Sequence, residues 1–225
     1  GNVTEITSST STLSEGWYIV KGEITNDNRL TVSGEVNLIL TDGCTLNVAN
    51  GICVPEGTTL NIYGQIQGTG KLVASNDSNA ENAAIGGNKN VKAGSIVING
   101  GVVEATSGIS SSMNAGAAIG GGCSCRATDV EINGGVVKAS GSNLYSATIG
   151  MGNIPSNGAH SVTIHGGTIT ASAALYAIGS GSDISNYCTV TVDGGNISGN
   201  VCGKTLTNTS GTSISRVEIT LNGAT

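Results

Sequence analysis

The 225-residue chain has few charged residues, few aromatic residues and very little proline. Charged residues make up 11% of the chain, aromatic residues 3%, and phenylalanine is absent. The nine basic residues do not cluster with aromatic side chains, as nucleic-acid-binding surfaces require. No apolar run approaches the roughly 18 residues that a membrane span needs. We therefore expect neither a nucleic-acid partner nor a membrane span.

Glycine, in contrast, is abundant, with 36 of the 225 residues. It follows no triplet period, which excludes a collagen-like chain. Hydrophobic residues make up 38% of the chain, and many are β-branched, which excludes an intrinsically disordered one. The length fits one domain. The composition therefore predicts one folded domain of short strands joined by tight turns.

Three short elements recur along the chain in a constant order. The first is a small residue followed by Ile-Gly, and its isoleucines Ile85, Ile119, Ile149 and Ile178 are 34, 30 and 29 residues apart. The second alternates apolar and variable residues and ends in Gly-Gly, and the third follows it directly. The second element occupies residues 96–101, 130–135, 162–167 and 190–195; the third occupies residues 103–105, 137–139, 169–171 and 197–199. Repetition with loops of variable length is typical of a solenoid.

Each element alternates with the period of two that is typical of a strand. Strands this short must pair with their copies in the next coil to bury a face. We therefore predict an all-β, single-stranded, right-handed parallel β-helix of about six to seven three-strand coils. Weaker copies of the elements are expected at Ile52 and at residues 38–40, 60–62, 72–74, 202–203 and 219–223. The predicted inward columns are Ile96, Val130, Val162, Val190, Ile219 and Ile98, Ile132, Ile164, Val192, Leu221.

The first 16 residues are rich in Ser and Thr and differ from the repeat. We predict that residues 1–16 form an N-terminal cap or linker and that residues 17–225 form the β-helix. Open sheet edges invite aggregation, so the single tryptophan, Trp17, is expected to shield the first coil. The alternative is that Trp17 stacks on a sugar ring.

The sequence contains a characteristic opening followed by repeated motifs. The opening includes GWYIV at residues 16–20, LILTDG at 38–43, LNIYGQ at 60–65 and GTGKL at 68–72. Copies of AIGG and INGG follow it. Over roughly residues 16–200 the chain resembles a family of exported surface-protein repeats from gut and rumen anaerobes, often labelled carbohydrate-binding domains. The resemblance implies an exported bacterial β-helix, secreted or on the cell surface, within a larger surface protein. It implies no catalytic residues.

A polar column precedes the Gly-Gly pairs, at Asn99, Asn133, His165, Asp193 and Asn222. Asn and Asp suit this corner because they tolerate turn conformations, so a structural ladder is one interpretation. His165 and Asp193 are expected one coil apart, at about 4.8 Å. The other interpretation is therefore a carboxylate-oriented imidazole that acts in binding or in acid–base chemistry. No nucleophile or second carboxylate is predicted beside the pair.

The loop between the first and second elements presents Cys123, Cys125, His160 and Cys188 in successive coils. Thiolates and imidazoles are zinc ligands, so these four residues could form a metal site. A disulfide, Cys125–Cys188 or Cys188–Cys202, is the favoured alternative, and buried apolar thiols are a third. We expect no metal and no cofactor.

Three tyrosines, Tyr145, Tyr176 and Tyr187, also occur in successive coils. Aligned rings would offer contact area to a sugar polymer, whereas the alternative is that they fill corners of the coil. Together with His165 and Asp193, they are the predicted ligand-binding residues.

The acidic residues do not stack as in β-helix lyases or glycoside hydrolases, which need calcium-binding or paired carboxylates. Asp129 and Glu131 share a coil, but the equivalent positions in neighbouring coils are not acidic, and Glu104 and Lys138 suggest only an exposed ion pair. We predict a non-catalytic, exported module that binds a polysaccharide or a host or plant glycan. The alternatives are a structural spacer or adhesin stalk without a small ligand, and a glycan-cleaving β-helix enzyme.

Overall fold

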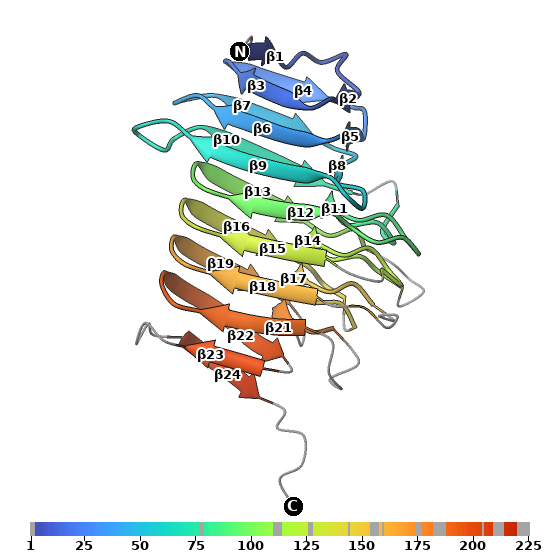
Figure 1. Ribbon diagram of the computed structural model, residues 1–225, viewed down its shortest axis with the longest axis vertical. Coiled ribbons are helices and arrows are strands. Elements are labelled where there is room, and N and C mark those ends of the chain that lie inside the picture. Colours follow the sequence, from blue (N-terminus) through green and yellow to red (C-terminus); the bar gives the residue numbers. More distant parts are fainter. Residues whose placement is uncertain are drawn as a thin grey trace, which may run out of the picture.

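A computed structural model shows strands stacked along one axis, with the two termini at opposite ends (Figure 1). It describes residues 3–76, 79–109, 114–125, 128–143, 145–153, 158, 160–173, 177–181 and 188–203, and the backbone of residues 205–208 and 214–219. The described residues contain strands and no helix, which confirms the all-β prediction. Within them, no helix is long and apolar enough to cross a membrane.

One parallel sheet, called sheet A here, runs the length of the stack and contains the second elements of the repeat. Its strands are, in spatial order, β1 (Val3–Glu5), β3 (Gly16–Val20), β6 (Glu35–Leu40), β9 (Thr59–Gly64), β12 (Ser95–Ile98), β15 (Thr128–Ile132), β18 (His160–Ile164), β21 (Cys188–Val192) and β23 (Thr205–Asn208). Each strand therefore pairs with its counterpart in the coils before and after it.

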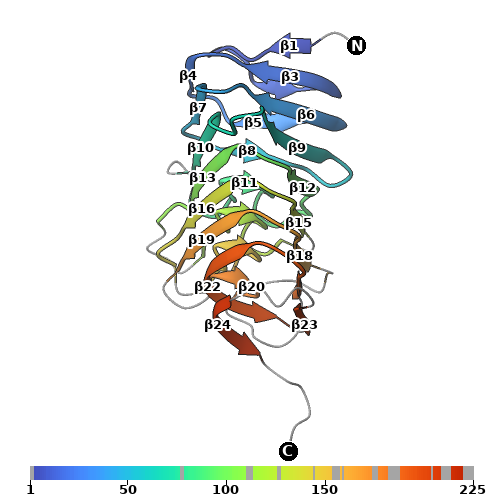
Figure 2. The ribbon, with the colours of Figure 1, turned by 90° about the vertical axis from the view of Figure 1, so that its left-hand side faces the viewer.

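The second sheet, sheet B, consists of two parallel runs on the other sides of the tube (Figure 2). The third elements form β4 (Glu23–Asn26), β7 (Thr45–Val48), β10 (Lys71–Ser75), β13 (Val102–Thr106), β16 (Val136–Ser140) and β19 (Thr168–Ser172). The first elements form β2 (Thr12–Leu13), β5 (Leu30–Val32), β8 (Ile52–Cys53), β11 (Ile85–Gly86), β14 (Ile119–Gly120), β17 (Ile149–Gly150) and β20 (Ile178–Gly179). The long strand β22 (Asn196–Gly203) joins the runs, because it pairs with both β19 and β20, and β24 (Ile214–Ile219) pairs with β22. The coils that start at β3 and end at β21–β22 confirm the predicted three-strand parallel β-helix.

The apolar side chains of successive coils stack in the predicted inward columns. Ile96 is in register with Val130, Val130 with Val162, and Val162 with Val190. All four are at most 1% exposed. Burial of each aliphatic side chain of this size stabilises the fold by roughly 1.5–3 kcal/mol. The core is thus a continuous apolar column rather than a single compact centre.

The glycine of each Ile-Gly pair is required by close backbone packing. Gly86, Gly120 and Gly150 are in register, each with a φ between 127° and 138°, a region that disfavours other residues. A Cβ atom on any of the three would collide with the carbonyl oxygen of the residue in the next coil. The repeat therefore keeps glycine here because the coils could not otherwise stack this closely.

At the C-terminal end, two elements of the predicted repeat lie at other residues than expected. Leu206, rather than Ile219, is in register with Val190, and Ile219 pairs with Gly203 instead. Val201-Cys202, rather than Cys202-Gly203, is in register with Ile178-Gly179. The reason is that β22 continues through the corner without a loop, which shortens this coil. Leu221 and Asn222, placed in the predicted columns, lie outside the described residues.

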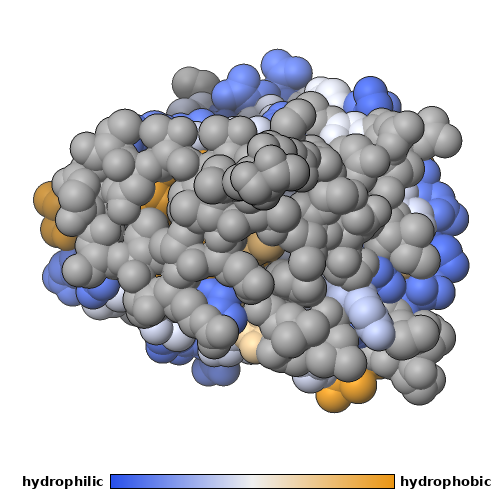
Figure 3. Space-filling model, turned by 90° about the horizontal axis from the view of Figure 1, so that it is seen from below, coloured by the Kyte–Doolittle hydropathy of each residue, from blue (hydrophilic) through white to orange (hydrophobic). Residues whose placement is uncertain are grey.

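At the N-terminal end, the segment predicted as a cap or linker continues the stack. Strand β1 pairs with β3 and strand β2 with β5, and Ile6 and Leu13 are buried in the core. The expectation that Trp17 shields the first coil is wrong, because strand alternation turns it outward and it stays 44% exposed. Tyr18 points inward instead, and its hydroxyl accepts a hydrogen bond from the Ser14 amide at 2.9 Å. Seen from the C-terminal end, the described side chains around the rim are mostly hydrophilic (Figure 3).

Candidate functional site

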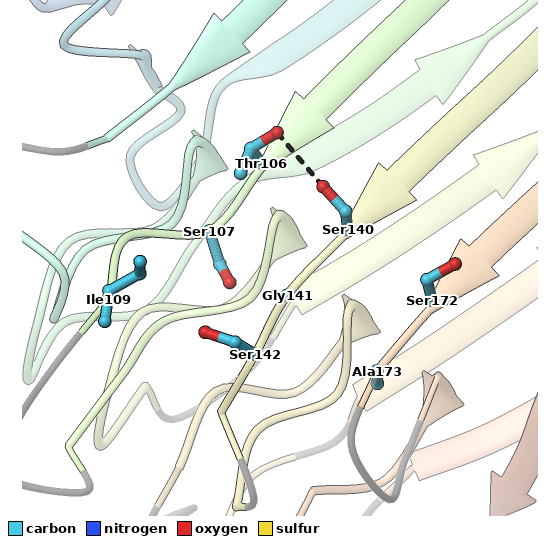
Figure 4. A pocket seen from close by; sticks show the side chains of 8 residues that line it. All are labelled: Thr106, Ser107, Ile109, Ser140, Gly141, Ser142, Ser172 and Ala173. Carbon is cyan, nitrogen blue, oxygen red and sulfur yellow. Dashed lines mark hydrogen bonds between the residues drawn. The ribbon is translucent and has the colours of Figure 1, made fainter.

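Three hydroxyl side chains lie in register on the outer side of strands β13, β16 and β19. Thr106 pairs with Ser140, and Ser140 pairs with Ser172. They point outward because the alternate residues of the same strands, such as Ala105 and Ala139, are buried in the core. The Thr106 Oγ1 and Ser140 Oγ atoms are 3.1 Å apart and hydrogen bonded (Figure 4). The repeat therefore places one hydroxyl per coil, at intervals of about 4.8 Å.

The three hydroxyl groups lie where two surface hollows meet. One hollow of about 380 Å³ lies where the strands end, and another of about 420 Å³ lies along the strands. Thr106, Ser140 and Ser172 line both hollows, so the hollows adjoin along the hydroxyl row. We call the combined feature the hydroxyl groove. Its other lining residues are Glu104, Ala105, Ser107, Ile109, Lys138, Ala139, Gly141, Ser142, Thr170 and Ala173.

Ser107 supplies a buried hydroxyl group to the groove. The residue is 3% exposed, and its Oγ has no hydrogen-bond partner. The side chain points toward the Gly141–Ser142 segment (Figure 4). A Cβ on Gly141 would lie 2.7 Å from this Oγ, so the glycine leaves the space that the hydroxyl occupies.

The rim of the groove combines apolar and charged groups. Ile109 is 84% exposed, which is unusual for an isoleucine. At the other end, the Glu104 carboxylate accepts a hydrogen bond from Lys138 at 3.0 Å and lies 3.6 Å from Lys71. The hydrogen bond from Lys138, together with the charge of Lys71, lowers the pKa of Glu104. The predicted Glu104–Lys138 ion pair is therefore confirmed, with a second cation beside it.

The polar corner column is present on the edge of sheet A. Asn133 Nδ2 donates to Asn99 Oδ1 at 3.0 Å, as expected for a ladder. One coil further, His165 Nδ1 and Asp193 Oδ1 are 2.6 Å apart, with side-chain exposures of 42% and 37%. The expected juxtaposition of His165 and Asp193 is thus observed. Neither residue lines the hydroxyl groove.

Of the three predicted tyrosines, the structure describes one. Tyr145 is half-buried between β16 and β17, in the same connection as Ser142 of the groove. Tyr176 and Tyr187 lie outside the described residues, so the expected alignment of the three rings stays a prediction. Only Tyr145 can therefore be assigned to the neighbourhood of the groove.

Of the predicted Cys/His loop cluster, Cys123 and Cys125 lie in the loop between β14 and β15, but His160 and Cys188 lie in strands. His160 and Cys188 are the first residues of β18 and β21, are in register, and point into the core with exposures of 2% and 0%. Burial lowers the pKa of His160 to about 4 and raises that of the Cys188 thiol to about 12. Cys123 and Cys125 are also buried.

The structure also bears on the two chemical hypotheses for these residues, a disulfide and a metal site. Cys188 is a free thiol, so neither of the two expected disulfides is present. Among the described residues, no three His, Cys, Asp or Glu side chains gather closely enough to hold a metal ion. The expectation that His160 and Cys188 lie in a loop was wrong because β18 and β21 begin earlier than the repeat suggested. Both side chains therefore point into the core.

Sequence reasoning missed the groove residues Thr106, Ser107, Ser140 and Ser172. A signal was present, since the position after the third element is Thr or Ser in three consecutive copies. What the sequence did not show was the hollow beside them, because a hollow depends on how the side chains of successive coils pack.

Comparison with known proteins agrees with the fold. A family described as "Beta helix repeat" matches residues 96–123, 130–153 and 162–182. Each match covers one complete coil, from β12 to β14, from β15 to β17 and from β18 to β20. No curated protein and no solved structure gives a significant match. The match and the structure agree that the chain is built of β-helix repeats.

Proposed function

We propose that the protein is a non-catalytic glycan-binding module and that the hydroxyl groove is its binding site. The observation that carries this proposal is the row of Thr106, Ser140 and Ser172 along which two surface hollows adjoin. Hydroxyl groups both donate and accept hydrogen bonds, as sugar hydroxyls do. Their spacing of about 4.8 Å is close to the length of one sugar residue in an extended polymer. A polysaccharide chain would therefore lie along the stack and meet each coil in turn.

One further feature supports contact with a sugar ring. The exposed Ile109 at one end of the groove offers an apolar contact to the C–H face of such a ring. By the resemblance of residues 16–200, we extend the proposal to an exported bacterial module within a larger secreted or cell-surface protein.

The proposal is tested by affinity electrophoresis in gels that contain soluble plant or mucin-type glycans. We expect retardation of the wild-type chain by at least one glycan. The variant Thr106→Val/Ser140→Ala removes two of the three hydroxyl groups of the row. It should weaken retention by roughly tenfold, because each lost hydrogen bond contributes about 0.5–1.5 kcal/mol.

A matched control is Thr163→Val/Thr191→Val, which removes hydroxyls from outward positions of β18 and β21 on sheet A. This variant should bind as the wild type does. If the chain is instead a spacer or stalk without a small ligand, no glycan will retard it, and the proposal is then abandoned. Equal weakening by both variants would also contradict a site in the groove.

A further inference from the structure

Sheet A carries an aromatic cluster on its outer side at the N-terminal end of the stack. The rings of Trp17 and Tyr63 are stacked, with centroids 5.6 Å apart and planes inclined by 26°. They belong to β3 and β9, which are separated by β6, so the two side chains reach across the strand between them. Even so, Trp17 remains 44% exposed. An indole left this open in a chain with one tryptophan is not accounted for by the core.

Polar groups lie directly beside the rings. Asn61 is only 8% exposed although it points outward, and its Nδ2 donates to Asn37 Oδ1 at 3.0 Å and to Glu35 Oε1 at 3.2 Å. The Tyr63 hydroxyl is 3.5 Å from the same Asn37 oxygen. These contacts hold amide and carboxylate groups in place at the edge of the aromatic surface. A rigid ring pair edged by fixed hydrogen-bonding groups matches a sugar, which has an apolar face and a rim of hydroxyls.

The cluster is confined to the first coils. The column that contains Trp17 continues through Asn37, Asn61, Val97, Glu131, Thr163 and Thr191. No aromatic residue follows Trp17 in it. The column that contains Tyr63 runs from Glu5 through Ile19 and Ile39, so the two rings lie beside apolar side chains over β3, β6 and β9. The concentration of aromatic surface at one place indicates a local site rather than a general property of the sheet.

We propose that Trp17 and Tyr63, with Asn37 and Glu35 at their edge, form a second binding site that takes a neutral sugar ring. A negatively charged sugar is disfavoured because the Glu35 carboxylate stands beside the rings and receives its hydrogen bond from a neutral amide. Nearby, Glu5 is occupied by Lys21 at 3.0 Å. The site is on a different side of the tube from the hydroxyl groove, which lies over β13, β16 and β19 (Figure 2). Binding at the aromatic site therefore does not require the hydroxyl groove.

The single tryptophan makes this site directly observable, since tryptophan emission from the chain comes from Trp17 alone. The experiment is a fluorescence titration of the full chain with cellohexaose, mannohexaose and xylohexaose, and with trigalacturonate as the acidic probe. We expect a saturable change in Trp17 emission with at least one neutral oligosaccharide, and none with trigalacturonate at the same concentration.

Variants separate binding from packing. Tyr63→Ala should weaken the titration about tenfold, because an aromatic contact contributes roughly 0.5–1.5 kcal/mol beyond the buried area. The matched variant Tyr63→Phe keeps the ring and should bind within about twofold of the wild type. Asn37→Ala, which removes the oxygen shared by Asn61 and Tyr63, should weaken binding several-fold. Circular dichroism of each variant reports whether the fold is kept.

The groove variant Thr106→Val/Ser140→Ala distinguishes the two sites. It should leave the Trp17 titration unchanged even where it weakens retention in glycan gels. No change in Trp17 emission with any of the three neutral oligosaccharides would overturn the second site and leave the groove untouched. A response that is lost in the groove variant, or that is equal for neutral and acidic probes, would also overturn it.

Discussion

The inner and outer sides of the same strands differ in how far they vary from coil to coil. Inside, β12, β15, β18 and β21 present Ile96, Val130, Val162 and Val190, which are nearly the same size and fully buried. Outside, the next residues of those strands are Val97, Glu131, Thr163 and Thr191, which range from an apolar to a charged side chain. Every coil must fill the same volume of core, whereas water accepts a wide range of side chains. The inner side therefore maintains the fold, and the outer side is free to carry function.

The largest expected effect concerns the inner backbone. In Gly120→Ala, the new Cβ would collide with the carbonyl oxygen of Gly150, at a φ of 131°. Backbone strain and overpacking together should lower the free energy of unfolding by about 3 kcal/mol or more. Gly43→Ala is the control, since its φ is also positive but no atom lies within 4 Å of the added Cβ. It should cost about 1–2 kcal/mol. Urea unfolding midpoints measure the stability of both variants. Equal losses of stability in Gly120→Ala and Gly43→Ala would contradict the role of close packing between coils.

A smaller effect is expected from His160, a polar residue on the inner side. Its pKa is about 4 in the folded chain, below the ordinary value of 6.5, because burial disfavours the charged imidazole. Between these two values the unfolded chain binds more protons than the folded chain. The free energy of unfolding should therefore fall as the pH is lowered from about 6.5 to 4, by roughly 3 kcal/mol.

Thermal unfolding measured at intervals from pH 7 to pH 4 tests the role of His160. In His160→Val, the part of the pH dependence that belongs to this residue should disappear. If the wild type and the variant lose stability in parallel, His160 is not the group responsible.

The smallest expected effect concerns the outer side. The Glu104–Lys138 ion pair lies at the surface, so a double-mutant cycle with Glu104→Gln and Lys138→Gln should give a coupling free energy below about 1 kcal/mol. The coupling should shrink further at 1 M salt, where charges are screened within about 3 Å. A coupling of several kcal/mol would mean that outer and inner sides contribute alike to stability.

Much of the fold could be predicted from the sequence because the repeat is a local pattern. The order of the three elements, the inward isoleucines and the Ile-Gly corners are all visible as spacing, and the structure has them in register. The prediction failed where a coil departs from the pattern. At β22, for example, the chain passes the corner without a loop, so Leu206 takes the place assigned to Ile219.

The candidate sites were less predictable, because they depend on distances between coils and on which side a residue faces. His165 and Asp193 could be paired in advance, since both precede a Gly-Gly pair in adjacent coils. His160 and Cys188 could not be assigned to the core, because one residue of difference in where a strand begins reverses the side that a residue faces. The contact between Trp17 and Tyr63 spans two coils, and the spacing of the repeat does not predict it.

By itself, the sequence determined that this chain folds as a parallel β-helix, because periodic apolar residues and glycines must stack to be buried. Only the tertiary structure decided where its surface is hollowed and where its aromatic rings meet. The hydroxyl groove lies over β13, β16 and β19, where hydroxyl groups of successive coils come into register, and the aromatic site arises from side chains that lean across β6. Both are arrangements of outward residues, whose partners are set by the stacking of coils and not by neighbours in the chain.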